Sequence, residues 1–332
     1  MQELGDGANI GTANGAIALD CSVRPVRNHP HLFSISTTDF FFPLVDSPYV
    51  QGRIGAANVL SDLYAEGVSE TDFVLMLLAA SRDMEPAQRT ICTRELIRGF
   101  RDACVLAGTA VTGGQTVLNP WPIVGGVATS VVADTEFIRS DGAQVGNVLV
   151  LTKPLGTQIA VNVHEWKKDP SHKLWTKTVN VLGGTDKATE QAAEMLHQAI
   201  CSMARLNRNG ALLMQKYKAT AATDVTGFGI LGHVQNLTEN QVAEVGMELD
   251  VLPMIAGTKL VNDEVFNFRL TVGYSAETSG GLLICLPDDD AANAFIAEIQ
   301  TLDGAPAWKV GRVTADPHRK ARIMDTASFP EV

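Results

Sequence analysis

The sequence predicts an α/β protein of two domains, from its length, its apolar content and its alternation of strand-like and helix-like segments. The chain has 332 residues, of which 45% are apolar, so it can bury a large core and exceeds the usual span of one domain. A polar, Gly-containing stretch at 140–146 separates two such alternating halves. We therefore predict a Gly-rich lead-in at 1–15, a first domain at 16–145 and a second domain at 146–332.

The first half opens with glycines among polar residues, a composition that cannot bury apolar area and that we expect to stay mobile without a partner. The first helix is expected to end at Gly67, and Pro86 is expected to open the second. We expect strands at 15–26 and 31–42, a helix at 49–66, a strand at 72–80, a helix at 86–106, and strands at 109–115 and 123–132. We write the order of this domain as βββαβαββ, with one strand more before the first helix than these ranges contain.

The second half is expected to begin with an apolar strand at 147–152 and to alternate strands with helices after it. A long helix is predicted from the apolar residues that share one of its faces, namely Leu196, Ile200, Met203 and Leu206. Further strands are expected at 243–251, 281–286 and 308–313, and an amphipathic helix with acidic residues at its start is expected at 288–302.

Composition and charge exclude several classes of function. A net charge of −11 argues against a protein that binds nucleic acid directly, because such proteins need clustered Lys and Arg. The five cysteines form no C-x-x-C pair and the seven histidines are dispersed, so we expect reduced thiols, no zinc site and a cytoplasmic location. No apolar run approaches the roughly 20 residues that span a bilayer, so no membrane partner is expected.

Four aspartates follow small or apolar residues at comparable positions: Asp20, Asp39, Asp62 and Asp224. A carboxylate at the end of a buried element is costly unless it is paired, hydrogen-bonded or bound to a cation. Magnesium suits such a set, because it takes oxygen ligands and bridges carboxylates to nucleotide phosphates. Taken singly, each of these residues is more often a helix cap or a turn aspartate than a metal ligand.

Two shorter patterns could contact the same ligand. Asn58 and Asp62 are four residues apart on the first predicted helix, so both side chains share a face, as they also would in an ordinary polar stripe. The pair Gly113 and Gly114, followed by Gln115 and Thr116, could cradle an anion with its backbone amides or could be a plain turn. Neither pattern matches a P-loop or a dinucleotide fingerprint.

Three further segments are ambiguous. The Gly-rich stretch 224–233 places a carboxylate and free amides near a helix start, which suits phosphate, but it also fits a tightly packed strand-to-helix crossover. We expect His233 to pack or cap rather than to catalyse. Lys153 could reach a phosphate or could have a structural role. The same two interpretations remain for the turn at 277–281.

Longer segments carry a family resemblance. The stretches TTDFFFPLVDSPY (37–49), GGQTVLNPW (113–121) and ATDVTGFGILGH (222–233) closely resemble selenophosphate synthetase, and the resemblance runs from about Gly15 to the end of the chain. It implies the aminoimidazole ribonucleotide synthetase-like architecture, with two α/β domains and with strands of two first domains joined in a dimeric barrel. It also implies the family reaction, in which ATP, selenide and water give selenophosphate, AMP and phosphate for selenocysteine synthesis.

The resemblance assigns site residues motif by motif. Asp20, Asp62 and Asp224 match the magnesium-binding aspartates, and Asp62 also matches a position that serves the nucleotide. Asp39 and the run Gly113, Gly114, Gln115 and Thr116 match the ATP-contacting positions. The implied cofactors are several Mg²⁺ ions, with K⁺ as a further candidate, and ATP and selenide are substrates. The implied partners are a second copy of the chain and candidate selenium-delivery or selenocysteine-machinery proteins.

One departure from the family bears on activity. Family members carry, upstream of the Asp20 motif, a Gly-rich segment with a Cys or selenocysteine and then a Lys. Here the first cysteine is Cys21 and the first lysine is Lys153. We therefore expect an N-terminally shortened chain that lacks these catalytic residues and is inactive or strongly impaired as given. A smaller departure is the single aspartate before Pro48, where the family often has two.

Two alternatives remain open on the sequence alone. One is another ATP-dependent member of the same superfamily, against which the long motif matches count. The other is a paralogue that binds nucleotide or partners without making selenophosphate, which the missing Cys and Lys favour.

Overall fold

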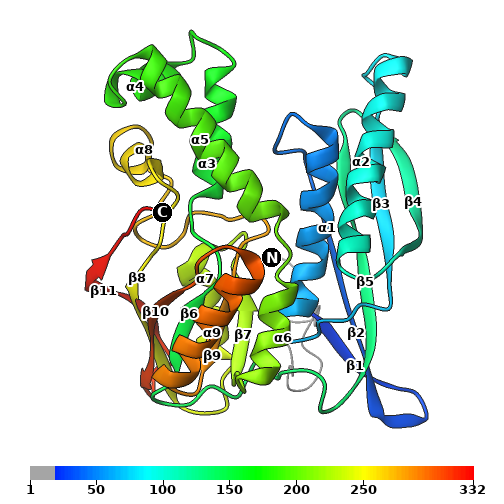
Figure 1. The fold of residues 1–332 in the computed structure, drawn as a ribbon, viewed down its shortest axis with the longest axis vertical. Coiled ribbons are helices and arrows are strands. Elements are labelled where there is room, and N and C mark those ends of the chain that lie inside the picture. Colours follow the sequence, from blue (N-terminus) through cyan, green and yellow to red (C-terminus); the bar gives the residue numbers. More distant parts are fainter. Residues whose placement is uncertain (1–18) are drawn as a thin grey trace, which may run out of the picture.

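The computed structural model describes residues 19–332 and arranges them as two β-sheets with helices packed on them (Figure 1). The first half contains β1 (Ser22–Val26), β2 (His29–Phe41), α1 (Pro48–Ala65), β3 (Phe73–Ser81), α2 (Pro86–Leu106), β4 (Val111–Asn119) and β5 (Ile123–Ala133). The second half contains β6 (Val148–Leu151), α3 (Thr157–Lys167), α4 (Lys173–Val181), α5 (Thr185–Ala204), α6 (Arg208–Lys216), β7 (Ala221–Asp224), α7 (Gly229–Glu239), β8 (Val245–Val251), α8 (Thr258–Glu264), β9 (Leu282–Leu286), α9 (Asp289–Asp303), β10 (Trp308–Ala315) and β11 (Ala321–Ser328).

The first sheet has the strand order β1-β2-β5-β3-β4 and is antiparallel except for the parallel pair β3 and β4. Helices α1 and α2 lie together against it (Figure 1). Strand β4 forms one edge and is exposed along most of its length. No other described strand covers this edge.

Helix α1 is central to the fold because it contacts both halves of the chain. It packs on α2 and β5 on the first-domain side, and on α5, α6 and β7 on the second-domain side. Ser47 caps its start by accepting a hydrogen bond from the Val50 amide at 3.4 Å, and Pro48 occupies the first turn, where its missing N–H costs nothing. Burial on two sides explains why most of this helix is inaccessible to solvent.

Two glycines allow α1 and α2 to approach closely. A Cβ atom on Gly52 would lie 2.2 Å from the carbonyl oxygen of Leu96, and one on Gly99 would lie 1.8 Å from the carbonyl oxygen of Tyr49. Both atoms that would be met are backbone, which cannot rotate away. The helix pair can therefore keep this spacing only with glycine at these positions.

We expect Gly99→Ala to destabilise the protein by about 1–3 kcal/mol, the usual cost of overpacking. Chemical denaturation followed by circular dichroism measures this change. Gly108→Ala is the comparison, because a Cβ atom there meets nothing within 4 Å, although its φ of +81° adds backbone strain. An unchanged denaturation midpoint for Gly99→Ala would contradict the close packing of α1 on α2.

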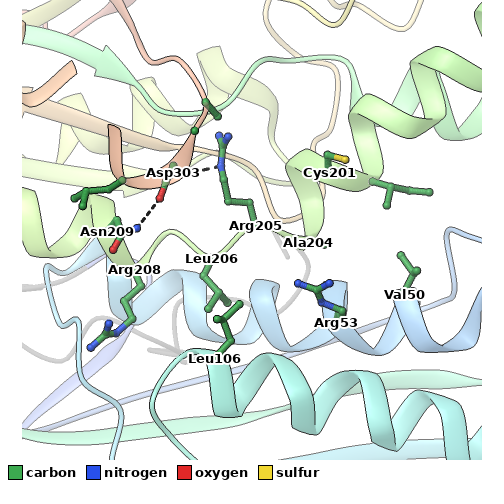
Figure 2. A pocket seen from close by; sticks show the side chains of 14 residues that line it. Val50, Arg53, Leu106, Cys201, Ala204, Arg205, Leu206, Arg208, Asn209 and Asp303 are labelled. Carbon is green, nitrogen blue, oxygen red and sulfur yellow. Dashed lines mark hydrogen bonds and ion pairs between the residues drawn. The ribbon is translucent and has the colours of Figure 1, made fainter. Parts of the chain in front are cut away.

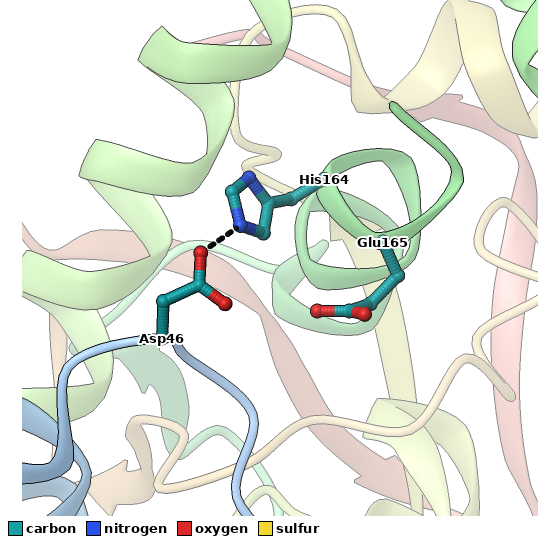
Figure 3. Close-up of side chains that lie close together, drawn as sticks. All are labelled: Asp46, His164 and Glu165. Atoms are coloured by element: carbon teal, nitrogen blue, oxygen red, sulfur yellow. Dashed lines mark hydrogen bonds and ion pairs between the residues drawn. The ribbon is translucent and has the colours of Figure 1, made fainter. Parts of the chain in front are cut away.

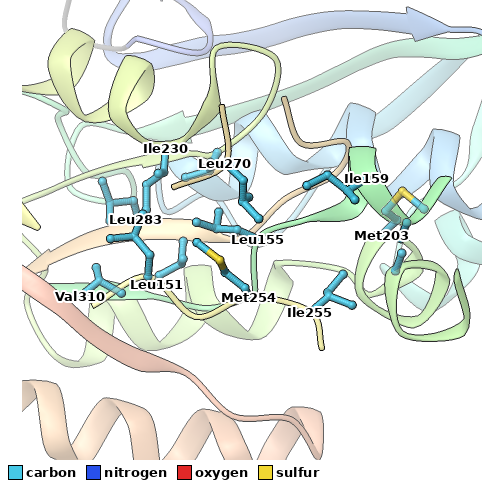
Figure 4. Packing of buried hydrophobic residues seen from close by; sticks show 14 of the residues in the cluster. Leu151, Leu155, Ile159, Met203, Ile230, Met254, Ile255, Leu270, Leu283 and Val310 are labelled. Carbon is cyan, nitrogen blue, oxygen red and sulfur yellow. The ribbon is translucent and has the colours of Figure 1, made fainter. Parts of the chain in front are cut away.

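The second sheet has the order β11-β8-β10-β6-β9-β7, and its strands β6 and β9 are buried along their whole length. Leu151 and Leu283 belong to a cluster with Leu155, Ile159 and Met254, shown in Figure 4. The alternate residues of the same strands belong to a second cluster, which includes Phe295 of α9 and continues into the core of the first domain. Apolar packing on both faces explains why these strands read as continuous apolar runs.

The fold confirms the two-domain α/β prediction and corrects several of its details. The described chain has two strands before α1, so the first-domain order there is ββαβαββ rather than βββαβαββ. The lead-in at 1–15 and the start of the first expected strand lie outside the described residues. The chain passes from the first sheet to the second between Ala133 and Val148, and the predicted boundary at 145/146 stays a prediction.

The predicted face of the long helix α5 is wrong in part. Leu206 lies beyond the end of the helix, and Leu196 and Ile200 are only half-buried. The buried positions are instead mostly small or flexible residues: Ala188, Ala192, Met195, Ala199, Ser202 and Met203. Alanines permit α5 to pack closely on α3, so the largest apolar residues do not mark the buried face here.

Candidate active site

Four aspartates from both halves of the chain converge where the halves meet. Asp20 lies two residues before the start of β1, Asp39 lies near the end of β2, Asp62 lies in the C-terminal part of α1, and Asp224 ends β7. Burial raises the pKa of each of the other three, and the negative charge of Asp224 raises it further. The set predicted from scattered sequence positions is therefore one electrostatic cluster, which we call the aspartate cluster.

Hydroxyl groups orient the carboxylates of the aspartate cluster. The Thr223 hydroxyl donates to Asp20 Oδ2 at 2.9 Å, and the Thr37 hydroxyl donates to Asp62 Oδ2. In both pairs the donor comes from a different element than the acid, so each bond also fixes the relative position of two elements. One carboxylate oxygen of each acid is left for another partner.

Asparagine and serine side chains of α1 hold the remaining two carboxylates. Asn58 donates to Asp39 Oδ2 at 3.0 Å and accepts from the Ser279 amide at 2.9 Å, so it joins the two domains. Ser61 donates to Asp224 Oδ2 at 2.7 Å. The sequence left open whether Asn58 shares a ligand with Asp62 or belongs to an ordinary polar stripe, and in the structure its side chain positions Asp39.

The electrostatics of the cluster favour bound cations. Burial raises the pKa of Asp62 well above its ordinary value, and Asp224, Asp39 and Asp20 raise it further. Burial and the charge of Asp224 raise the pKa of Asp39 to about 6. Burial raises the pKa of Asp224, although the Ser61 hydroxyl and then Lys153 act in the opposite direction. Lys153 Nζ already donates to the carbonyls of Arg205 and Ser279, both at 2.8 Å.

The donor set fits magnesium better than a softer metal. It offers carboxylate oxygens, which Mg²⁺ prefers. The neighbouring Cys21 is not offered as a thiolate, because burial and then the charge of Asp62 raise the pKa of its thiol. Within residues 19–332, one group of three acidic, histidine or cysteine side chains brings its ligand atoms within 4.8 Å of one another. This group is Asp46, His164 and Glu165, which lie outside the aspartate cluster. The aspartates are thus spaced for ions that complete their shells with water or phosphate oxygens rather than for one closed cage.

The glycine pair lies apart from this cluster within one chain. Gly113, Gly114, Gln115 and Thr116 are inside strand β4, not in the turn that the sequence suggested. Strands β5 and β3 separate β4 from β2, which carries Asp39. Gly114 has φ +144°, and a Cβ atom on it would lie 1.9 Å from the Met76 carbonyl oxygen, so it is required by the strand pairing itself.

Comparisons with known proteins place this geometry in a family. The models of the "AIR synthase related protein" N-terminal and C-terminal domains match residues 16–132 and 144–324. "Selenide, water dikinase" of Trypanosoma brucei brucei is 50% identical over 305 residues, which cover 90% of this chain and 76% of that protein. "Selenide, water dikinase 2" of Homo sapiens is 50% identical over 319 residues, covering 95% and 69% of the two chains. The chain belongs to the selenide, water dikinase family.

The fold of this dikinase-family chain is shared more widely. The solved structure "AaThiL complexed with AMPPCP and TMP" aligns with a TM-score of 0.66 over 94% of this chain and 89% of that one, at 16% identity. The family resemblance and the two-domain α/β fold predicted from the sequence are thereby confirmed, whereas the dimeric barrel stays a prediction. No helix within residues 19–332 combines the length and apolar character needed to cross a membrane.

Reasoning from the sequence did not identify one buried acid that lies beside the aspartate cluster. Glu66 is inaccessible to solvent and accepts hydrogen bonds from the Leu19 amide at 3.2 Å and from the Ser140 hydroxyl. Burial raises its pKa, and the charge of Asp20 raises it further. Glu66 follows Asp62 by four residues and is the C-cap of α1, so a search for acids on one face of the helix predicted at 49–66 would have found it.

A second acidic group joins the two domains at the surface. Asp46, His164 and Glu165 are the side chains shown together in Figure 3. Asp46 Oδ2 lies 2.8 Å from His164 Nε2, and the Lys168 ammonium lies 2.6 Å from both Asp46 Oδ1 and Glu165 Oε1. Because Lys168 already bridges both carboxylates, this group is an interdomain ion-pair cluster rather than a metal site.

The Gly-rich segment and the 277–281 turn act as structural caps in the dikinase-family fold. His233 Nε2 accepts from the Thr226 amide at 3.0 Å, and burial lowers the pKa of His233 to about 4, so the ring is neutral. Glu277 accepts from the Gly156 and Thr157 amides at 2.7 and 2.9 Å, at the start of α3. Burial raises the pKa of Glu277 to about 7.

Proposed function

We propose that this chain is the core of a selenide, water dikinase, which converts ATP, selenide and water into selenophosphate, AMP and phosphate. The observation that carries the proposal is the aspartate cluster between the two domains. Buried carboxylates with raised pKa values need cations, and a polyphosphate needs the same cations to approach them. The family match supplies the selenium substrate, which the geometry of the cluster alone does not identify.

In this proposal Asp20, Asp62 and Asp224 hold magnesium ions, which neutralise charge on the phosphate groups of ATP. Thr223 and Ser61 keep Asp20 and Asp224 oriented, so the carboxylates need not reorganise when ions arrive. Positions that match the family's nucleotide contacts are Asp39, Asp62 and the β4 run.

The chain is proposed to work as a homodimer, because one subunit does not assemble the whole predicted nucleotide site. The distance from β2 to β4 spans three strand spacings of about 4.8 Å, or about 14 Å in all. Gln115 of one subunit is therefore too far from Asp39 of the same subunit to contact one phosphate with it. A partner's β4 beside β2 would remove this separation.

The face of the first sheet opposite α1 and α2 supports this pairing. Leu75, Leu77 and Val127 alternate onto that face and are only half-buried. Val117 and Phe40 share the same face by strand register and are 50% and 61% exposed. Exposed apolar side chains on an uncovered sheet face indicate a protein interface.

We expect Val117→Arg to shift the protein from dimer to monomer, because a charge would be buried in the proposed interface. Sedimentation velocity at micromolar concentration measures the shift. Val145→Arg is the matched control, since Val145 is 60% exposed and lies in the segment that connects β5 to β6, outside the first sheet. If the unsubstituted chain sediments as a monomer, or if Val117→Arg stays dimeric, the proposed interface is wrong.

Other finer features of the function are part of the same proposal. All five cysteines are unpaired, which fits a reducing cytoplasm. Proteins that deliver selenium or use selenophosphate are candidate partners. The requirement for a Cys or selenocysteine and a Lys from the family's N-terminal segment stays a prediction, and K⁺ stays a candidate cation.

Phosphorus-31 NMR of the reaction mixture tests the proposed activity. With the protein extended by the family's N-terminal segment, the proposal requires a new phosphorus resonance, coupled to selenium, that appears only with ATP, magnesium and selenide together. Selenide-independent ATP hydrolysis to ADP would instead favour another ATP-dependent member of the superfamily.

A further inference from the structure

A cavity of about 760 Å³ lies between the two domains and shares no lining residue with the aspartate cluster (Figure 2). One wall is formed by α1, with Val50 and Arg53, and by the end of α2, with Leu106. The opposite walls are the 200–209 segment, which joins α5 to α6, and the 302–305 segment at the end of α9. Its volume and its position at a domain interface are typical of small-molecule sites.

Three arginines, Arg53, Arg205 and Arg208, line the cavity together with one carboxylate, Asp303. Arg208 is already committed, since its Nε donates to the Ser69 carbonyl at 3.0 Å and its Nη2 pairs with Glu70. Arg205 is partly committed, since its Nη2 donates to the Thr152 carbonyl at 2.7 Å and its Nε lies 3.8 Å from Asp303 Oδ2. Arg53 makes no hydrogen bond or ion pair with any residue in 19–332, so its guanidinium is available to a ligand.

The start of helix α6 adds backbone donors to the same cavity. Asn207 precedes the helix, but its side chain does not cap it. The Asn207 amide group donates instead to Ser61 Oγ at 2.9 Å and to the Gly280 carbonyl at 2.8 Å. Arg208 and Asn209, the first residues of α6, line the cavity, and the Asn209 side chain donates to Asp303 Oδ1 at 2.7 Å (Figure 2). An uncapped helix start attracts anions through its free amides and its dipole.

The remaining lining is apolar and defines the rest of the ligand. Val50, Leu106, Ile200, Leu206 and Leu302 line the cavity from four different segments. We propose that this cavity binds a small organic anion, a phosphate monoester with a compact apolar group. The phosphate pairs with Arg53 and the start of α6, and the apolar group lies against the aliphatic side chains. With a single carboxylate in the lining, this binding needs no divalent cation.

The cavity also connects to the aspartate cluster. Asn207 at the head of α6 donates to Ser61, and Ser61 donates to Asp224 at 2.7 Å. An anion that accepts hydrogen bonds from the first turn of α6 therefore acts, through Asn207, on Ser61, the residue that positions Asp224. Occupancy of the cavity therefore changes the affinity of the aspartate cluster for magnesium. This coupling rests on the proposed metal role of Asp224, whereas anion binding itself does not.

Titration calorimetry with phenyl phosphate in the presence of EDTA tests the binding site independently of the reaction. The unsubstituted chain should bind saturably, and Arg53→Gln should weaken binding about tenfold or more. Arg27→Gln removes the same charge from an exposed turn and should leave binding unchanged. Absence of saturable binding, or equal binding by the Arg53→Gln variant, overturns the proposal.

A second variant fills the cavity. Cys201 is exposed on α5 and lines the cavity, so Cys201→Trp should block phenyl phosphate while leaving the thermal unfolding midpoint unchanged. Retained binding by a folded Cys201→Trp protein contradicts the location. For the coupling, magnesium titrations with and without phenyl phosphate should differ in affinity by about fivefold or more. Equal magnesium affinities overturn the coupling, and no magnesium binding at all overturns the proposed metal role instead.

Discussion

Asp224→Asn is expected to lower selenide-dependent AMP formation by about 100- to 1000-fold, the usual cost of removing one group that stabilises transition-state charge. Asp224 is 2% exposed and its charge acts on all three other aspartates of the cluster. The asparagine keeps an oxygen that can accept from Ser61, so the change removes charge rather than shape. Chromatographic measurement of AMP at saturating magnesium gives the effect.

Asp325→Asn is the control for this prediction, because Asp325 is an exposed carboxylate on β11. It should leave the rate of AMP formation unchanged. The assay uses a form of the protein that carries the family's N-terminal segment, so that the background rate is measurable. Equal rates for the Asp224→Asn and unsubstituted proteins would contradict the assignment of the aspartate cluster as the magnesium site.

Saturating magnesium is expected to raise the melting temperature at both pH values, and the rise is expected to be about 5–10 °C larger at pH 8 than at pH 5. Burial and neighbouring charge raise the pKa of Asp39 from 3.8 to about 6 and that of Asp62 well above its ordinary value. The folded metal-free chain therefore binds more protons than the unfolded chain from about pH 4 upward, and its stability falls as the pH rises through this window. Magnesium binds the ionised carboxylates and offsets that loss, whereas protons compete with it at pH 5.

Thermal unfolding with magnesium or with EDTA at the two pH values measures this difference. The Asp62→Asn protein provides the internal comparison, since it should gain less from magnesium at pH 8. A gain that is the same at both pH values, or that Asp62→Asn leaves intact, would show that the ions bind outside the aspartate cluster.

Apolar periodicity predicted most of the elements that frame the site. The limits expected for α1, α2, β3 and α9 lie within one or two residues of the observed ones, because each has a long apolar pattern and a clear start or stop signal. The buried face of α5 was predicted less well. Its packing uses Ala192 and Ala199, and small residues leave no periodic signal for size-based reasoning.

The residues of the site were easier to predict from the sequence than their arrangement in space. Asp20 and Asp224 were both candidates, but their proximity depends on how β7 and the start of β1 meet across the domains, which no local pattern encodes. Ser61 and Glu66 were missed because a serine and a glutamate on a helix usually face solvent. Their roles follow from α1 being buried on two sides.

The most direct test of the proposed function is conversion of ATP to AMP with magnesium, measured with and without selenide. It compares this chain with the same chain extended by the family's N-terminal Cys- or selenocysteine- and Lys-containing segment. The account predicts that the extended chain forms AMP only when selenide and magnesium are both present, and that this chain alone forms little or none. If the extended chain binds ATP but forms no AMP with selenide, the dikinase assignment is wrong and a nucleotide-binding paralogue replaces it.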